Sequence, residues 1–153
     1  MSCEKIIDKE NFIVYECEED KIAKIRENED IIECDVKGFE IINPKKEVIK
    51  FIAIDNCLIT SGEKIKRCDF ALIKNNETYL IELKTDVKPK NRNKKLKEAL
   101  KQLKGCIQKF DNILECFVCF DKQVTLKSSW ATKINTFLEE EGILLKIECK
   151  KEF

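Results

Sequence analysis

The sequence predicts an α/β fold in which a mixed central sheet is flanked by helices. Residues 65–85 read as two apolar strands joined by a tight turn, which makes them antiparallel neighbours. Residues 94–110 carry an apolar stripe at helical spacing, and 113–120 form an almost continuous apolar run, typical of a strand buried on both faces. Because a strand, a helix and a second strand make a parallel crossover, the sheet must contain both kinds of pairing.

The composition indicates one globular domain without a membrane-spanning segment. Of the 153 residues, 43% are apolar and 38% are charged, and no apolar run approaches the length of a membrane span. Residues 1–10 are too charged for a signal peptide, so we expect a cytoplasmic protein with no membrane partner. We divide the domain into an N-terminal extension (1–47), a core (48–120) and a C-terminal helix and strand (121–153).

The N-terminal extension has the weakest pattern. Residues 11–17 and 31–42 are interpreted as strands, and 20–27 as a short helix or an acidic loop. Pro44 either breaks the second strand pattern or begins a helix that carries Glu47.

Residues 48–60 are expected to form the first core strand, bent near Asp55 and Asn56. We interpret Asp55 as a turn former whose carboxylate bonds nearby amides. The alternative is a group that supports the lysine or the water of a metal site.

The turn of the central hairpin is Asn75-Asn76, a pair that tolerates the positive φ of a two-residue turn. If the residues on either side of this pair oppose each other, opposed residue numbers sum to 151 and Asp69 lies opposite Glu82. Side chains alternate along a strand, so Lys84 shares the face of Glu82. The other face is predicted to be ordinary core and carries Cys68, Phe70, Leu72, Tyr79, Ile81 and Leu83.

Two opposed carboxylates need a physical reason. At a separation of about 5 Å and an effective dielectric of about 20, they repel by roughly 3 kcal/mol. Mg²⁺ reverses the sign of this energy, because it binds one or two carboxylates together with water and phosphate. The ammonium of Lys84 would then orient the attacking water and balance charge on a phosphate. The alternative is a surface ion pair, either Glu82 with Lys84 or Asp69 with Arg67, which contributes little.

Cys68-Asp69 followed after about a dozen residues by Glu82-Leu83-Lys84 resembles the PD-(D/E)xK nuclease superfamily, with its restriction-endonuclease-like αβββαβ core. The resemblance implies that Asp69 and Glu82 bind the metal and that Lys84 assists the attacking water. Cys68 stands where the family name has proline. The resemblance covers residues 48–120, and the C-terminal helix and strand are additional. The family also expects a helix before the first core strand, often with one more acid, for which Glu40 and Glu47 are open candidates.

The helix expected over 94–110 presents a basic stripe of Lys97, Lys101 and Lys104. Residues 84–109 hold ten basic and two acidic residues, so this stripe is interpreted either as a solvated face or as a grip for a phosphate backbone. Gln102 lies beside the apolar stripe. The resemblance implies that Gln102 positions water or substrate in the active site, and the alternative is an ordinary surface amide.

The remaining elements are a helix over 130–141, capped by Ser128 or Ser129 and ended by Gly142, and a last strand over 143–149. The nine cysteines are expected to be reduced and mostly buried. Cys116 and Cys119 should point to opposite faces of a strand, which argues against a zinc site.

These patterns predict a nuclease that depends on Mg²⁺ or Mn²⁺ and hydrolyses phosphodiester bonds of nucleic acid, DNA being expected. The alternative is a non-catalytic module that binds nucleic acid or protein on the same fold. A domain of this size is expected to use a homodimer or a partner protein for specificity. The sequence leaves open the choice between DNA and RNA, the cut site, the oligomer and the biological pathway.

Overall fold

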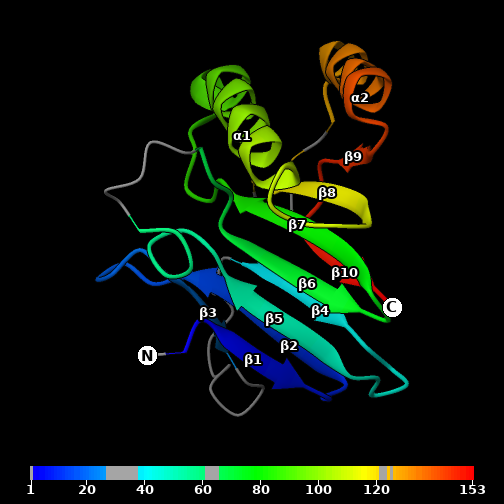
Figure 1. Ribbon diagram of the computed structural model, residues 1–153. Coiled ribbons are helices and arrows are strands. Elements are labelled where there is room, and N and C mark those ends of the chain that lie inside the picture. The colour runs from blue at the N-terminus through cyan, green and yellow to red at the C-terminus, as the bar shows by residue number, and fades with distance from the viewer. Residues whose placement is uncertain (1, 27–37, 61–65, 121–123, 125) are drawn as a thin grey trace.

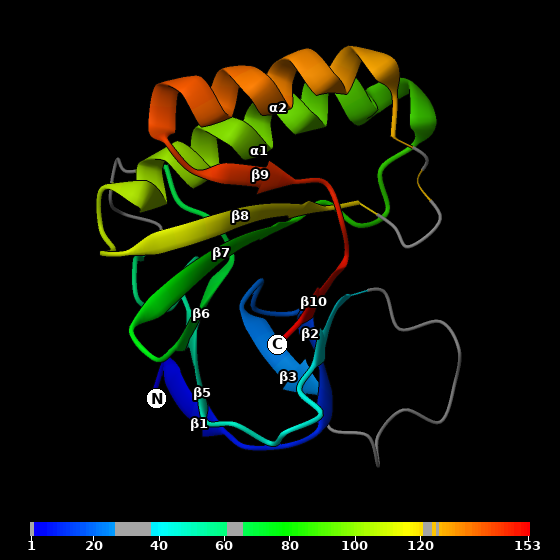
Figure 2. The same ribbon diagram turned by 90° about the vertical axis from the view of Figure 1, so that its right-hand side faces the viewer.

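The computed structural model describes residues 2–26, 38–60, 66–120, 124 and 126–153. In these ranges the chain is an α/β protein with two mixed sheets and two α-helices. The views in Figures 1 and 2 show three layers, with the helices on one face of the larger sheet and the smaller sheet on the other. The mixed α/β class is therefore confirmed, and the helices that flank the larger sheet lie on one of its faces.

The larger sheet has six strands in the order β1-β5-β6-β7-β8-β9. Its antiparallel part joins β1, β5, β6 and β7, and its parallel part joins β7, β8 and β9. The mixed pairing follows the prediction, since β8 returns parallel to β7 after a helix. The strands are β1 (Glu4–Ile7), β5 (Ile49–Ala53), β6 (Phe70–Lys74), β7 (Glu77–Leu83), β8 (Ile113–Cys119) and β9 (Leu144–Lys146).

The hairpin of β6 and β7 has the predicted register. Each pair from Phe70↔Ile81 to Lys74↔Glu77 is opposed as expected. Asn75 and Asn76 have φ angles of 51° and 63°, which are the positive values of a two-residue turn that matches the twist of the strands.

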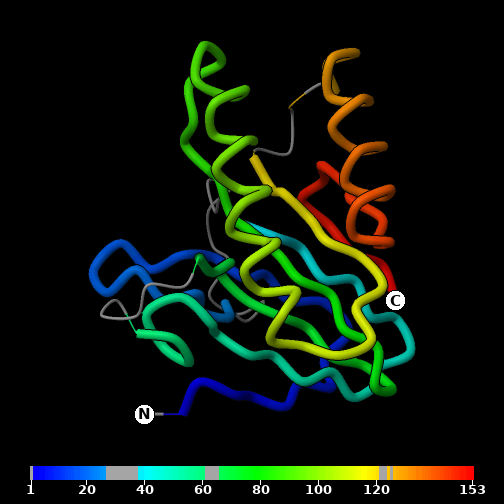
Figure 3. Tube along the Cα trace, turned by 45° about the horizontal axis from the view of Figure 1, so that its top comes forward, coloured from blue at the N-terminus to red at the C-terminus, as the bar shows by residue number. Residues whose placement is uncertain are grey.

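Both helices lie on the same face of the larger sheet. Figure 3 shows α1 (Arg92–Ile107) and α2 (Ser128–Glu141) next to each other, and a short 3₁₀ turn at Pro89–Asn91 leads into α1. The predicted helices are confirmed with shifted ends. Gly142 ends α2 in the left-handed conformation, as expected, but the residue that precedes α2 is Lys127, which makes no side-chain cap.

The smaller sheet was not expected. It has four strands in the order β10-β4-β2-β3, namely β10 (Lys150–Glu152), β4 (Phe39–Ile42), β2 (Asn11–Glu16) and β3 (Ala23–Arg26). The strand over 11–17 is confirmed, but the helix or loop expected at 20–27 contains β3. The strand expected at 31–42 is described only in its last part, as β4, because 27–37 lie outside the described residues.

Two further expectations concern the edges of this sheet. Of the two alternatives for Pro44, the break in the strand pattern is confirmed: β4 ends at Ile42 and the chain turns, with a bond from the Lys46 N–H to the Asn43 carbonyl at 3.0 Å, so Pro44 begins no helix. The single C-terminal strand is two strands in different sheets, since β9 pairs with β8 and β10 pairs with β4. The turn expected at 61–63 lies outside the described residues.

Apolar side chains fill the spaces on both faces of the larger sheet. Between the two sheets, the aromatic core consists of Phe12, Phe39, Phe51, Phe70 and Phe117. Under the helices, the core includes Leu80, Leu96, Leu103, Trp130 and Phe137. Cys116 packs under the helices and Cys119 between the sheets, so the two sulfur atoms point to opposite faces as predicted.

The expectation that all nine cysteines are reduced is wrong for four of them. Within the described residues, Cys3 is bonded to Cys57 and Cys119 to Cys149, with Cα–Cα distances of 5.7 and 4.5 Å. Disulfides are typical of oxidising compartments, so the cytoplasmic location stays a prediction. In the described part of the chain, no helix has the length and apolar character needed to cross a membrane.

Candidate functional site

Asp69 is held by its backbone and by its side chain. Its N–H donates to the carbonyl of Ile81 at 3.1 Å, and its own carbonyl accepts the N–H of Ile54 at 2.9 Å. Its Oδ2 accepts the N–H of Leu83, on the neighbouring strand, at 2.6 Å. Asp69 is only 4% exposed, so these bonds fix a buried carboxylate at the point where the chain enters β6.

Glu82 meets Asp69 across the hairpin. The two carboxyl groups are in hydrogen-bond contact, and Glu82 is 2% exposed. Its Oε2 lies 3.1 Å from Nζ of Lys84, whereas its buried Oε1 has no hydrogen-bond partner in the structure. Asp69, Glu82 and Lys84 are therefore brought together just beyond the last pair of the hairpin ladder, Phe70↔Ile81, and one carboxylate oxygen of Glu82 has no hydrogen-bond partner.

Burial disfavours the charged form of both carboxyl groups. It is the largest cause of the raised pKa of Asp69, against which the bonds from Glu82 and Leu83 act. Burial and then the charge of Asp69 raise the pKa of Glu82 well above its ordinary value, although Lys84 lowers it. A pair of this kind is stabilised by anything that adds positive charge, either a proton or a cation.

Lys84 is placed by the strand on the other side of β7. Its backbone N–H donates to the carbonyl of Cys119 at 2.7 Å, and its side chain is 15% exposed. The ammonium therefore lies beside the carboxylate pair with a small part of its surface in contact with solvent.

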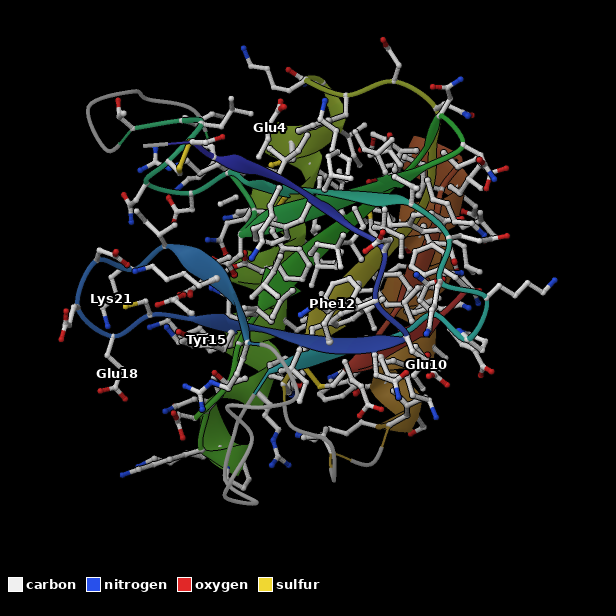
Figure 4. The ribbon with its side chains drawn as sticks, turned by 90° about the horizontal axis from the view of Figure 1, so that it is seen from below. Glu4, Glu10, Phe12, Tyr15, Glu18 and Lys21 are labelled. Carbon is white, nitrogen blue, oxygen red and sulfur yellow. A yellow bond between two sulfur atoms is a disulfide. The ribbon has the colours of Figure 1, made fainter. Side chains whose placement is uncertain are left out.

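Glu16 is a site residue that the sequence reasoning missed. Along β2 the side chains of Phe12, Val14 and Glu16 alternate onto the face that meets the larger sheet, and Glu16 is the half-buried last one. Burial, and next the charge of Asp69, raise its pKa, while Lys21 lowers it. Figure 4 shows Lys21 in the turn between β2 and β3. The alternation in the sequence gave the face of Glu16, but only the packing of the two sheets brings it to Asp69.

Asp55 also acts on these carboxyl groups. Its negative charge contributes to the raised pKa values of Asp69 and Glu16. The chain does turn here, with Asn56 at a φ of 61°. The Asp55 carboxylate accepts a hydrogen bond from Nε of Arg67, a contact that the turn interpretation did not include.

Cys68 does not face the core between the sheets as predicted. It packs on the helix side, where its N–H donates to Sγ of Cys106 on α1 at 2.9 Å. The reason is that the regular ladder ends at Phe70↔Ile81, so strict alternation of faces no longer applies before Phe70.

Gln102 and the basic stripe lie on different sides of α1. Gln102 is partly exposed, and its buried Oε1 has no hydrogen-bond partner in the structure. Lys97 and Lys101 are exposed, while Lys104 contacts Glu140 of α2 at 2.8 Å. The stripe is thus turned toward α2 and solvent, whereas the turn of α1 that contains Cys106 contacts the segment before Asp69.

Neither upstream acid considered from the sequence joins the carboxylate pair. Glu47 makes an ion pair with Lys74 beside the hairpin turn, at the end of β6 remote from Asp69. Glu40 lies between the inward-facing Phe39 and Ile41 on β4, so its side chain points to the outer face of the smaller sheet.

In the described ranges, no three Asp, Glu, Cys or His side chains converge as a ready-made metal cage. Mg²⁺ commonly uses only one or two carboxylates plus water and substrate phosphate, so the Asp69–Glu82 pair does not need a third protein ligand to bind it.

Comparisons with protein-family models, curated proteins and solved structures gave no match for this chain. The site therefore has to be interpreted from its own chemistry.

Proposed function

We propose that this chain is a nuclease of the PD-(D/E)xK kind that hydrolyses phosphodiester bonds of nucleic acid, DNA being the expected substrate, with Mg²⁺ or Mn²⁺. The observation that carries the proposal is the buried contact of Asp69 with Glu82 beside Lys84. Three antiparallel strands followed by a helix and a parallel strand are the order that the family resemblance leads us to expect, and β5, β6, β7, α1 and β8 have this order.

The donor set fits a hard divalent cation. Asp69 and Glu82 offer carboxylate oxygens, the type of ligand that Mg²⁺ and Mn²⁺ prefer. Glu82 Oε1 is buried without a partner, which is costly unless another group binds to it. When bound, the cation would supply Lewis-acid charge beside the phosphodiester.

The remaining roles belong to the chain itself. The Lys84 ammonium is positioned by the Glu82 carboxylate, donates hydrogen bonds to the attacking water and balances negative charge on the phosphate. Gln102 has an amide oxygen that makes no hydrogen bond in the structure and could accept one from a water molecule. Glu16 adds negative charge on the side of the smaller sheet, where it would favour retention of a cation.

Calorimetric titration with Mn²⁺ tests the metal site. Asp69→Ala and Glu82→Ala should abolish binding, whereas Glu139→Ala, at an exposed position on α2, should leave it unchanged. Lys84→Ala should retain Mn²⁺ yet lose cleavage of single-stranded, double-stranded and branched DNA and of RNA. Unchanged Mn²⁺ binding in both carboxylate variants would refute the proposed site.

The alternative is a binding module that uses the exposed lysines of α1 without catalysis. Lys97 and Lys101 are exposed on the helix face away from the carboxylate pair, so they can contact a phosphate backbone independently of it. Reversal of both lysines to glutamate should weaken nucleic-acid binding and make its salt dependence shallower. Binding that persists in Asp69→Ala without any cleavage by the parent protein would favour this alternative. A homodimer or partner protein for specificity remains part of the proposal.

A further inference from the structure

The loop after β5 bonds to Asp69 and to the segment that precedes it. The N–H of Ile54 donates to the Asp69 carbonyl at 2.9 Å. The next residue, Asp55, accepts a hydrogen bond from Arg67, which lies two residues before Asp69 in the chain. The loop therefore holds both the backbone of Asp69 and the segment that leads into it.

A disulfide fastens this loop to the start of the chain. Cys57 in the loop is bonded to Cys3, with a Cα–Cα distance of 5.7 Å. The Cys3 carbonyl also accepts the N–H of Ala53, the last residue of β5, at 2.8 Å. The loop that holds Asp69 is therefore closed by a covalent bond to a segment 54 residues away.

This disulfide is the more accessible of the two in the described residues. Cys3 and Cys57 are partly exposed, whereas Cys119 is 0% and Cys149 is 9% exposed. Because thiol–disulfide exchange requires a thiolate to reach a sulfur atom, a thiol reductant reacts first with Cys3–Cys57.

We propose that the Cys3–Cys57 disulfide is a redox-sensitive positioning element for Asp69. A thiolate of the reductant attacks one of the two sulfurs and forms a mixed disulfide, which a second reductant thiol then displaces. The two protein sulfurs take up two electrons and two protons, and the reductant leaves as its own disulfide. Reduction releases the loop from Cys3 and loosens its bond to the Asp69 carbonyl.

Amide hydrogen exchange without metal tests the positioning directly. The protein is compared in its oxidised form and after treatment with dithiothreitol, both well below the unfolding temperature. The amides of Ile54 and Leu83, which donate to Asp69, should exchange faster after reduction. The amide of Thr78, which donates to Asn112 near the hairpin turn, should not change and so reports that the fold is intact.

The second readout, which rests on the proposed function, is Mn²⁺ affinity. Reduction should weaken it by about 10-fold or more, the usual effect of losing a group that supports a metal ligand. Cys3→Ser should match the reduced protein and no longer respond to dithiothreitol. Cys17→Ser, which removes a partly exposed free thiol, should respond like the parent protein.

The outcomes separate the two proposals. Equal rates of amide exchange at Ile54 and Leu83 in the oxidised and reduced protein would overturn the positioning role. Faster exchange after reduction, in a protein whose Mn²⁺ affinity does not change on reduction, would overturn it as well. Exchange that depends on the redox state in a protein that binds no Mn²⁺ in either form would support the role of the disulfide and reject the proposed metal site.

Discussion

Glu82→Gln should make the protein more stable while it removes the proposed activity. The carboxylate of Glu82 is 2% exposed and faces Asp69, so the charged form is costly in the fold without a cation. Glutamine keeps the shape of the side chain and resembles its neutral form. The same replacement at exposed Glu139 on α2 is the matched control.

The magnitude follows from two opposing contacts. Two charged carboxylates in contact, at about 4 Å and an effective dielectric of about 20, repel by roughly 4 kcal/mol. Lys84, 3.1 Å from Glu82 Oε2, offsets part of this cost and loses its ion pair in the variant. Because the pKa of Glu82 is raised despite Lys84, burial and Asp69 outweigh the ion pair. We therefore expect the free energy of unfolding to rise by roughly 1–3 kcal/mol at pH 8.

The gain should depend on pH in a definite direction. A carboxyl whose folded pKa is raised keeps its proton in the fold at pH values where the unfolded chain has lost it. Parental stability therefore falls as pH rises from the ordinary value of 4.5 to the raised folded pKa. The glutamine variant lacks this loss, so the difference between the two proteins is small near pH 4 and largest at high pH.

Urea denaturation across this pH range, in buffer with a chelator, measures the effect. In thermal denaturation of a chain of this size, each kcal/mol of change in the free energy of unfolding corresponds to a shift in Tm of roughly 2–4 °C. A Glu82→Gln protein that is less stable than the parent at pH 8, or a difference that does not change with pH, would refute the reasoning. Glu139→Gln should stay close to the parent throughout.

Two further replacements test the packing that supports the site. A Gly-to-Ala replacement usually stabilises a helix, but at Gly105 the added Cβ would lie 1.9 Å from a backbone carbonyl of the segment before Cys68. We therefore expect Gly105→Ala to lower the free energy of unfolding, measured by urea denaturation, by about 1–3 kcal/mol. A gain in stability would contradict the close approach. Lys151→Met removes a contact at 2.6 Å from Glu115, whose carboxylate is only 9% exposed, and should cost about 1–2 kcal/mol at pH 7. Burial raises the pKa of Glu115, but hydrogen bonds from lysines outweigh it and the pKa is lowered. The stability that the ion pair contributes is therefore lost as pH falls through this lowered pKa. A stability difference between Lys151→Met and the parent that is equal at pH 7 and pH 2 would contradict the ion pair.

Elements set by local signals could be predicted from the sequence. The hairpin register follows from the Asn75-Asn76 turn and from the alternation of apolar residues on both sides of it. The helix α1 follows from its apolar spacing, and its return to a parallel β8 follows from chain handedness. These signals were sufficient to bring Asp69, Glu82 and Lys84 to one place.

Elements set by distant pairing could not be predicted. The strand β10 pairs with β4, which is more than a hundred residues earlier, and β3 has only four residues. Such short segments have no strong pattern until a partner strand is known. Disulfide connectivity also depends on the folded chain, so the Cys3–Cys57 bond gave no signal in the sequence.

The cost of the site and its proposed use have the same physical origin. The main chain holds Asp69 through the N–H of Leu83 and holds Lys84 through the carbonyl of Cys119, so the carboxylates cannot move apart to relieve their repulsion. Glu16 adds a further negative charge from the second sheet. Lys84 alone does not offset the charge of the two buried carboxylates, because the pKa values of Asp69 and Glu82 stay raised in its presence. The proposed divalent cation would supply further positive charge and, by binding only the folded site, would stabilise the fold by mass action. The removal of Glu82 should therefore raise the stability of the metal-free protein and cancel the stabilisation that Mn²⁺ gives to the parent.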